Sequence, residues 1–431
     1  MKKTLFSLLA LVALHAQATV LVVKEYGVNS TYSTINAALT AAVNNDTIVV
    51  YDKPSGQQWI EALTINKNLT FLHPTQGTRF KAPGQITVVP QAGMDLYFIG
   101  WDLNGNSITA TATGSTATSA NRAKITVTDC INVVNISLNV DWIDARVFYN
   151  QTNFTGQITM RHGIAVANVL ANGGIQIAPE STTAAQGDSV IISGNKARWC
   201  YFDSQESGFI ANNYLYLDNA NNTWWGVGTG NALNIKNHNQ SNNRTTWIVN
   251  NSITNAGGCS NVPRMAISIR YAGNVNNIKI INNLLYVDDG TCNNGVWAIY
   301  GDATAPNSNT GNPFISHNFV NTRSSVNYIS FSVNNELNYY SNALNGFGSI
   351  DTWGRAASGN ANLINKGNYL GQYYDIDLTR NDIGTYGGPF SIDNYLTGGV
   401  SKGRGLFIDI PHQLTNLNQI INAKAAAGSK F

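Results

Sequence analysis

A short phrase that recurs through the middle of the chain limits the available folds more than any other feature. Each copy has an apolar residue, any residue, a small or polar residue, Asn, any residue and an apolar residue. The copies are the segments 192–197, 210–215, 248–253, 280–285 and 315–320, with a shorter one at 340–344. Ile, Val, Thr and Tyr are frequent around them, so each copy predicts two short strands joined by a tight bend.

The spacing of the phrase indicates a solenoid. Its second polar position falls at residues 195, 213, 251, 283, 318 and 342, so the intervals are 18, 38, 32, 35 and 24 residues. These intervals cluster near one or two coils of about 18 to 20 residues with insertions, which is typical of a solenoid with variable loops. A propeller would repeat about every 40 to 50 residues. We therefore predict an all-β fold, a right-handed single-stranded parallel β-helix, rather than a propeller or a β-sandwich.

Stacking explains how such short strands can be stable. A strand of this length buries little alone, but it pairs its backbone with the coil below and adds its apolar face to a continuous core. The Asn at each bend tolerates left-handed backbone angles, and stacked Asn side chains can hydrogen-bond along the pile. We expect the following residues to be buried inside the solenoid: Ile210, Ile248, Ile281 and Ile315.

The first part of the chain predicts a short capping helix before the coils begin. Residues 32–42 have helical spacing, with Ser33 or Thr34 as the N-cap and with Ile35 and Leu39 on one face. Strands are predicted at 47–51, 63–65 and 69–72.

Residues 32–72 resemble the N-terminal cap and first coil of pectin-lyase-like parallel β-helix proteins. In that superfamily a Ser-Thr-Ile-x-x-Ala-Leu helix precedes Asp-Thr-Ile-Val-Val and Leu-Thr-Ile-x-x-x-Leu-Thr-Phe, as it does here. Residues 375–389 resemble the closing motif of many secreted β-helix proteins of Bacteroidetes. The resemblance spans about residues 32 to 390 and implies the fold, with the first helix plugging one end. It does not select among lyases, hydrolases, esterases and adhesins.

The N-terminus has the layout of a secretory signal. Lys2 and Lys3 precede an apolar run at 5–14, and Ala16 and Ala18 are small residues at the two positions that a signal peptidase reads. The apolar run is shorter than the roughly 20 residues of a spanning helix, and no later stretch predicts a transmembrane segment. We predict a signal peptide at 1–18, a β-helix with its N-terminal cap at 19–390, and a C-terminal cap or tail at 391–431. The expected location is extracellular, cell-surface or periplasmic.

The charge of the chain argues against polyanionic partners. The sequence has 26 basic and 24 acidic residues, and removal of 1–18 takes away two lysines, which leaves 24 of each. A neutral chain has no broad electrostatic attraction for nucleic acid or for anionic lipid.

The four cysteines suggest one disulfide. No C-x-x-C pair is present, so a zinc site is poorly supported. Cys259 and Cys292 lie in similar Gly-containing loops, and export permits a bond between them; two free thiols are the alternative. Cys130 and Cys200 lie beside strand-like residues and are predicted to be buried thiols.

The candidate binding residues lie around a pair of tryptophans. Trp224 and Trp225 stand in a Gly- and Asn-rich setting, where aromatic rings can stack on sugars. With Arg270 they are the candidate carbohydrate-binding residues. The alternative is a loop that packs against the solenoid.

Candidates for catalysis are fewer. Lys236, His238 and Arg264 are the candidates for a catalytic base. The segment 141–145 resembles part of the Trp-Ile-Asp-His signature of pectate lyases, but Ala145 stands where the histidine would be.

Three aspartates near the end of the predicted solenoid are the candidate metal ligands. Asp375, Asp377 and Asp382 are close enough in sequence to gather around Ca²⁺, which takes several oxygen ligands. A structural role in the C-terminal cap is the alternative, and no other cofactor is implied.

The sequence favours an exported, non-catalytic glycan-binding or cell-envelope protein, whose partner would be a polysaccharide or cell-surface glycan and not a nucleic acid. A polysaccharide-degrading lyase or glycoside hydrolase is the alternative.

Overall fold

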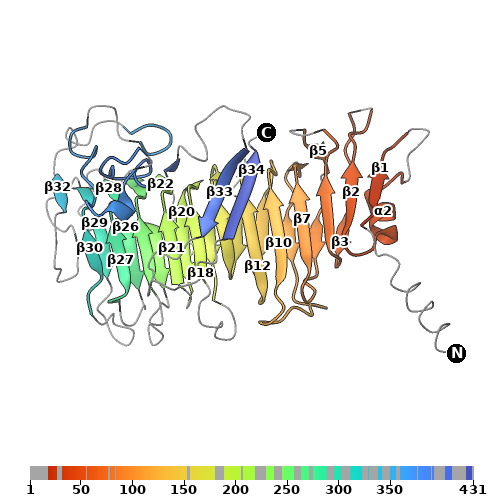
Figure 1. Cartoon of the computed structure of the whole chain (residues 1–431), viewed down its shortest axis with the longest axis horizontal. Helices are drawn as coiled ribbons and strands as arrows, with labels where there is room; N and C mark the ends of the chain where they lie inside the picture. The colour runs from red at the N-terminus through yellow and green to blue at the C-terminus, as the bar shows by residue number, and fades with distance from the viewer. Residues whose placement is uncertain are drawn as a thin grey trace, which may run out of the picture.

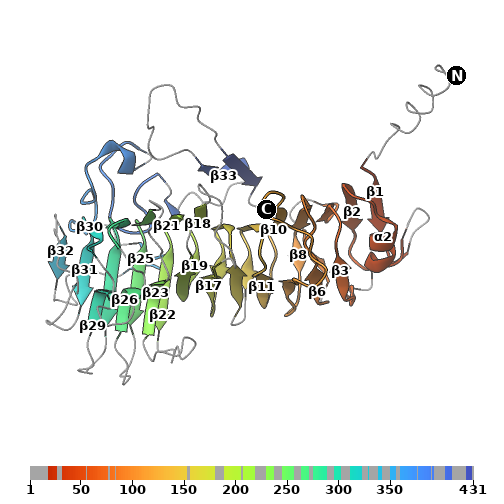
Figure 2. The same ribbon diagram turned by 90° about the horizontal axis from the view of Figure 1, so that it is seen from below.

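The computed structural model describes residues 18–26, 32–54, 56–75, 78–82, 84–152, 156–179, 189–204, 207–218, 230–236, 245–256, 264–270, 275–288, 296–301, 311–322, 329, 338–341, 350–355, 360–375, 377–389, 391–392, 403–409 and 424–429. The predicted fold is confirmed: the chain is a right-handed parallel β-helix, seen from two sides in Figures 1 and 2.

Three parallel sheets, named A, B and C, form the walls of the solenoid. Sheet A consists of β1 (Val20–Val23), β2 (Asp46–Val50), β4 (Leu69–Leu72), β7 (Asp95–Ile99), β10 (Ala123–Thr128), β12 (Ile143–Phe148), β15 (Gly163–Val166), β18 (Ser189–Ser193), β21 (Ser207–Ala211), β24 (Thr246–Val249), β27 (Ile278–Ile281) and β30 (Phe314–Ser316). Sheet B consists of β3 (Leu63–Ile65), β6 (Ile86–Val88), β9 (Ile108–Ala110), β11 (Asn135–Leu138), β14 (Gln157–Met160), β17 (Gly174–Ile177), β20 (Trp199–Asp203), β23 (Gly230–Lys236), β26 (Arg264–Arg270) and β29 (Val296–Gly301).

Sheet C begins later in the chain. It consists of β13 (Gln151–Thr152), β16 (Val169–Leu170), β19 (Lys196–Ala197), β22 (Tyr214–Asp218), β25 (Ser252–Ala256), β28 (Leu284–Asp288), β31 (Phe319–Thr322) and β32 (Tyr339–Ser341). The short strands β5 (Phe80–Lys81) and β8 (Trp101–Asp102) precede it, and isolated bridges through Ile131 connect β8 to β13. Each strand pairs with its equivalent one coil away, so the backbone hydrogen bonds of successive coils run along the solenoid.

The helix α2 (Ile35–Ala41) covers the N-terminal end of the solenoid, as predicted. Thr34 is its N-cap, and the Thr34 Oγ1 atom accepts a hydrogen bond of 3.0 Å from the backbone N of Ala37. Ile35 and Leu39 are buried and belong to the same apolar cluster as the interior of the coils. Glu61 holds the first turn by accepting hydrogen bonds from the backbone N atoms of Ile35 and Asn36 at 2.9 and 2.8 Å.

The solenoid interior is filled by the inward-facing residues of all three sheets. Ile210, Ile248 and Ile315 lie in this core with no exposed surface, as predicted. The prediction for Ile281 is wrong in one respect: it is buried, but Ile280 occupies the interior position in register with Ile248. Ile281 points outward, where it packs with Val249 and Tyr373.

A ladder of asparagine side chains runs along the corner between sheets A and C. Each Oδ1 atom accepts bonds from the backbone N and the Nδ2 of the ladder residue one coil earlier; Asn195, for example, accepts from Asn168 at 2.9 Å in both cases. The residues of the ladder are Asn150, Asn168, Asn195, Asn213, Asn251, Asn283, Asn318 and Asn338. Before each rung from Asn150 to Asn318 stands a residue with positive φ, such as Asn212 at 54° and Asn250 at 56°. The predicted role of the Asn bends is therefore confirmed, although Asn338 takes the last rung and Asn342 lies outside the described residues.

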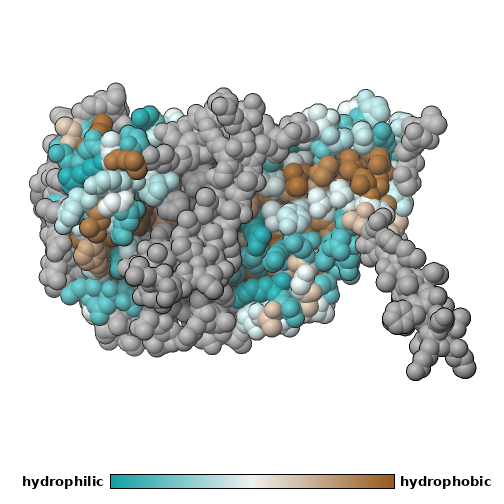
Figure 3. All heavy atoms as spheres, viewed as in Figure 1, coloured by the Kyte–Doolittle hydropathy of each residue, from teal (hydrophilic) through white to brown (hydrophobic). Residues whose placement is uncertain are grey.

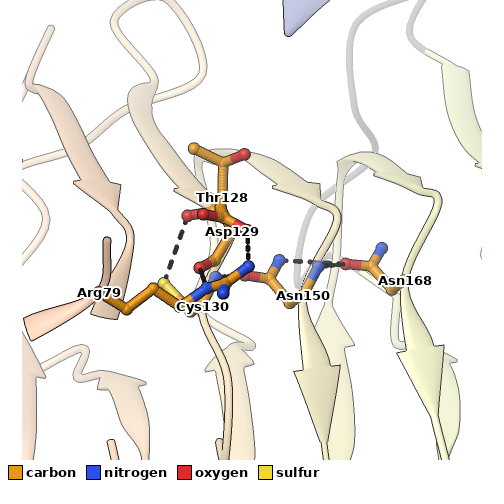
Figure 4. Close-up of polar contacts among 6 residues, drawn as sticks. All are labelled: Arg79, Thr128, Asp129, Cys130, Asn150 and Asn168. Atoms are coloured by element: carbon orange, nitrogen blue, oxygen red, sulfur yellow. Dashed lines mark hydrogen bonds and ion pairs between the residues drawn. The ribbon is translucent and has the colours of Figure 1, made fainter. Parts of the chain in front are cut away.

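A cysteine continues the ladder at its N-terminal end (Figure 4). Cys130 takes the position before Asn150, and its backbone N donates a bond of 3.0 Å to the Asn150 Oδ1 atom. Arg79 holds the preceding left-handed residue, Asp129, through an ion pair and through a bond of 2.9 Å from its Nε to the Asp129 carbonyl oxygen. Cys130 and Cys200 are buried free thiols, as predicted.

After the last coil the chain returns along the outside of the solenoid. Parts of the segment 350–392, which we call the return segment, lie against the corner between sheets A and C. It includes the 3-10 helix η3 (Gly371–Tyr373). The outward amides of this corner hold it: Asn212 Nδ2 donates to the carbonyl oxygens of Thr385 and Gly387 at 2.9 and 2.7 Å. Residues 375–389, which resemble a closing motif of secreted β-helix proteins, therefore lie along the side of the solenoid.

A lysine that is surrounded by three aromatic rings also holds the return segment in place. The Lys196 Nζ atom donates to the carbonyl oxygen of Thr352 at 2.5 Å. It also lies 4.8, 5.8 and 5.6 Å from the ring centroids of Trp353, Tyr214 and Tyr216. Burial lowers the pKa of this ammonium group.

Beyond the return segment, β33 (Gly403–Asp409) and β34 (Lys424–Ser429) pair antiparallel. Both strands lie within the C-terminal cap or tail that was predicted for residues 391–431.

Candidate functional site

The outer face of sheet B carries a group of polar side chains on four successive strands. On β20, β23, β26 and β29 the alternate residues Phe202, Ile235, Ile269 and Ile299 point into the core, so their neighbours point outward. We call this set the sheet B patch: Tyr201, Asp203, Asn234, Lys236, Ser268, Arg270 and Tyr300. Strand register aligns Tyr201, Asn234, Ser268 and Tyr300 in one row and Asp203, Lys236 and Arg270 in the next.

The centre of the sheet B patch contains buried polar atoms that bond to no described residue. The Asn234 Oδ1, Ser268 Oγ and Arg270 Nε atoms are buried and have no hydrogen-bond partner within the described part of the chain. Ser268 has no exposed surface and Arg270 is 8% exposed. Buried polar groups in folded proteins are nearly always hydrogen-bonded, and an exception is often the site of a bound molecule or water. The three atoms together offer an acceptor, a hydroxyl and a donor.

One edge of the sheet B patch is acidic. Asp203 lies beside Lys236, with 3.9 Å between the Asp203 Oδ2 and Lys236 Nζ atoms. The Tyr201 hydroxyl donates a bond of 3.2 Å to the same carboxylate oxygen. Burial, followed by the charge of Asp203, raises the pKa of Tyr201, so this phenol stays protonated at neutral pH.

The other edge of the sheet B patch is aromatic. The Arg270 guanidinium lies 5.6 Å from the centroid of the Tyr300 ring, which is within the range of a cation–π contact. Trp297 meets Tyr300 edge to face, with ring centroids 5.5 Å apart.

The sheet B patch as a whole has one net positive charge, because it contains one carboxylate, Asp203, and two cationic side chains, Lys236 and Arg270.

The structure brings together two of the predicted site residues and separates a third. Lys236 and Arg270 are direct neighbours on β23 and β26. Arg264 lies at the opposite end of β26, six residues or about 20 Å from Arg270. It is buried, and its Nη1 atom donates to the Asn255 Oδ1 atom at 3.2 Å. The remaining candidates, Trp224, Trp225, His238, Cys259 and Cys292, lie outside the described residues.

The three candidate calcium ligands serve the backbone of the return segment. Asp375 Oδ1 accepts a bond of 2.5 Å from the Gly388 N atom, Asp382 Oδ1 accepts one of 2.7 Å from Asn365 N, and Asp377 Oδ1 accepts one of 3.0 Å from Thr379 N. In the described part of the chain no three His, Cys, Asp or Glu side chains are placed to share a metal ion. This geometry fits the structural alternative better than a calcium site.

The segment that resembles a pectate-lyase signature does not form a site. Ala145 is fully buried and faces the interior from β12. Asp144 points outward on sheet A and pairs with Arg146 at 3.0 Å, whereas Asp141 pairs with Arg161 at 2.5 Å.

Sequence reasoning missed most of the sheet B patch. Tyr201, Asp203, Asn234, Ser268 and Tyr300 stand at outward positions of their strands, but the alternation of each short strand says nothing about its partner strand. Loops of unequal length separate these strands, so spacing alone does not align them. The register could be predicted only by aligning the inward-facing Ile and Leu residues of successive strands.

Comparisons with protein-family models, with curated proteins and with solved structures give no match to this chain. Among the described residues, no helix has both the length and the apolar character needed to cross a membrane.

Proposed function

We propose that this protein is an exported β-helix protein of the pectin-lyase-like kind that binds a glycan on the sheet B patch without cleaving it. The observation that carries the proposal is a set of three buried atoms on adjacent strands that have no hydrogen-bond partner among the described residues: Asn234 Oδ1, Ser268 Oγ and Arg270 Nε. A sugar hydroxyl both donates and accepts hydrogen bonds, so one or two hydroxyl groups would match this set once the side chains that bury it move aside. The signal-like residues 1–18 support export to a place where glycans are found.

The rest of the sheet B patch also suits a sugar. Tyr300 offers an aromatic ring beside Arg270, and such rings bind sugars without the need for charge. In parallel sheets the row continues from coil to coil about 4.8 Å apart, so an extended chain can contact several coils. A carboxylate on the glycan would meet the net positive charge of Lys236 and Arg270.

The alternative is a polysaccharide-degrading enzyme that acts at the same patch. One observation favours it: Asp203 and Lys236 lie 3.9 Å apart, and such a pair can exchange protons with a substrate. A glycoside hydrolase needs two carboxylates across the bond, and Asp203 is the only carboxylate among the seven residues of the sheet B patch.

Binding and turnover on a panel of neutral and uronate-containing polysaccharides test the proposal. We expect at least one polysaccharide to bind, and we expect Tyr300→Ala and Arg270→Gln each to weaken binding about tenfold, which is about 1.4 kcal/mol. Thr87→Ala is the matched control, because Thr87 occupies the outward row of sheet B on β6, far from the patch. Release of unsaturated or reducing ends that Lys236→Ala abolishes would reject the non-catalytic role. Binding that both patch variants leave unchanged would reject the site.

A further inference from the structure

The outer face of sheet A carries an apolar strip that is separate from the solenoid core. It consists of Phe148, Ile164, Val166, Ile191 and Phe209, with Tyr149 and Ala167 beside them, and these residues form a cluster of their own. Register aligns Ile164, Ile191 and Phe209 on β15, β18 and β21. The alternate residues Ala165, Ile192 and Ile210 face the interior, so the strip faces outward. We call it the outer apolar strip.

Most of the outer apolar strip is covered. Phe148, Val166 and Ile191 are 4%, 0% and 5% exposed, whereas Ile164 and Phe209 at its edge are half-buried. Val22, Val49 and Leu72 occupy the same outward row on β1, β2 and β4, where they are half-buried. Figure 3 shows apolar side chains over these first coils at the surface of this face. Residues with equivalent strand neighbours thus differ in exposure, so another segment packs over β12 and β15.

The next part of the same face shows how the chain covers it. Val249 and Ile281 also point outward from sheet A, and Tyr373 of the return segment packs on them with Trp247 at the edge. The return segment therefore shields the outward apolar residues of β24 and β27. The outer apolar strip begins at β21, the next strand of the sheet.

We infer that the outer apolar strip is the docking surface of the C-terminal ribbon, which is β33 (Gly403–Asp409) paired with β34 (Lys424–Ser429). Figures 1 and 2 both place the ribbon beside the central strands of sheet A, between β10 and β21. The ribbon contains Leu406 and Phe407. The eleven-residue step from Ile392 to Gly403 can span at most about 40 Å, whereas four strand spacings from β24 to β12 amount to about 19 Å.

Two general considerations favour this occupant. An isolated two-stranded ribbon is marginally stable in water, so the ribbon needs a surface that buries one of its faces. A contiguous apolar patch that faces water favours association with another surface, so a segment of the same chain that covers it is favoured. The same contact satisfies both needs and makes the end of the chain a strap across sheet A.

Hydrogen exchange of the full-length protein tests this docking. In the native protein we expect the amides of β33 and β34 to be protected. Ile191→Asp on the strip should reduce that protection about tenfold or more, because a charge beneath the ribbon costs docking energy. Phe407→Asp in the ribbon should have the same effect and should increase the oxidative labelling of Phe148 and Phe209. Thr70→Asp, on the outward face of β4, is the control and should leave the ribbon protected.

Two outcomes would overturn the inference. One is a ribbon that exchanges as fast in the native protein as in Ile191→Asp. The other is a full-length dimer in analytical ultracentrifugation that Ile191→Asp dissociates while the exchange of the ribbon is unchanged, which would assign the outer apolar strip to a second copy of the chain.

Discussion

Asn168 and Asn195 lie 27 residues apart in sequence and are joined side chain to side chain, with the Asn168 Nδ2 atom 2.9 Å from the Asn195 Oδ1 atom. The same Nδ2 atom donates to the carbonyl oxygen of Val147 at 2.9 Å. Each rung of the ladder therefore holds its own coil, the next rung and the backbone of the previous coil. Because these groups are fully buried, each bond that is lost leaves a polar atom without water.

We predict that Asn195→Ala destabilises the protein by about 3–5 kcal/mol. The substitution removes the acceptor of two bonds from Asn168 and the donor of bonds to Ala165 and Asn213, and it opens a small cavity. Urea unfolding followed by circular dichroism measures the effect, with midpoints compared because a solenoid need not unfold in two states. Asn121→Ala is the control, since Asn121 is exposed. Equal midpoints for the two variants would contradict the role of the ladder.

The sequence predicts the ladder at bends that consist of two consecutive asparagines. Asn212 and Asn213 form such a pair, in which the first residue takes the left-handed conformation and the second forms the rung. Asn150 and Asn168 were missed because Tyr149 and Ala167 take the left-handed position before them. A local pattern therefore predicts the fold class, but the coils with substituted bends are found only from their neighbours in space.

The sheet B patch and the return segment could not be predicted to the same extent. Lys236 was predicted as a candidate base and Arg270 as a candidate sugar-binding residue, but their alignment depends on the register of β23 and β26. The return segment contacts Asn212 through Thr385, which is more than 170 residues away in sequence. A short repeated pattern cannot predict a contact between residues so far apart. The site depends on these long-range alignments, whereas the fold depends on a repeated local one.

Adjacent residues on β27 should respond in opposite ways to the same substitution. Ile280→Asp places a carboxylate in the solenoid interior and should prevent folding of the coils. Ile281→Asp places it beneath Tyr373, and we expect native circular dichroism with a detached return segment. Trypsin provides the measurement: cleavage after Arg380, whose Nε atom bonds to the Gly367 carbonyl oxygen at 2.7 Å, should become faster. Similar loss of structure in both variants would show that the register of β27 is incorrect.

Two of the four cysteines should resist thiol reagents. Burial raises the pKa of Cys130 to about 12 and also raises that of Cys200, so neither forms the reactive thiolate near pH 8. Native protein treated with iodoacetamide should remain unlabelled at both residues, and denatured protein should be labelled. Mass spectrometry without reduction also tests the predicted Cys259–Cys292 disulfide, whose peptides should be linked. Fast native labelling of Cys130 would contradict its position in the ladder.

The attachment of the return segment should depend on pH through Asp375. Burial raises the pKa of this carboxyl group to about 6, and the charges of Asp382 and Asp377 act in the same direction against the backbone donors. A carboxyl group whose folded pKa exceeds its ordinary value of 3.8 contributes most stability when protonated. That contribution is complete below pH 3.8 and is lost as the pH rises through about 6.

Asp375→Asn isolates this effect, because the amide is neutral at every pH and keeps an oxygen for the Gly388 N atom. At pH 7.5 we expect slower hydrogen exchange in residues 377–389 of the variant than in the wild type, and near pH 4 we expect the two proteins to agree. Comparison at equal pH removes the intrinsic pH dependence of exchange. Asp377→Asn is the control, because the Thr379 hydroxyl and backbone N lower the pKa of that exposed carboxyl group, so its removal should not slow exchange. If the ratio of the Asp375→Asn and wild-type rates stayed constant from pH 4 to 7.5, Asp375 would not control the attachment.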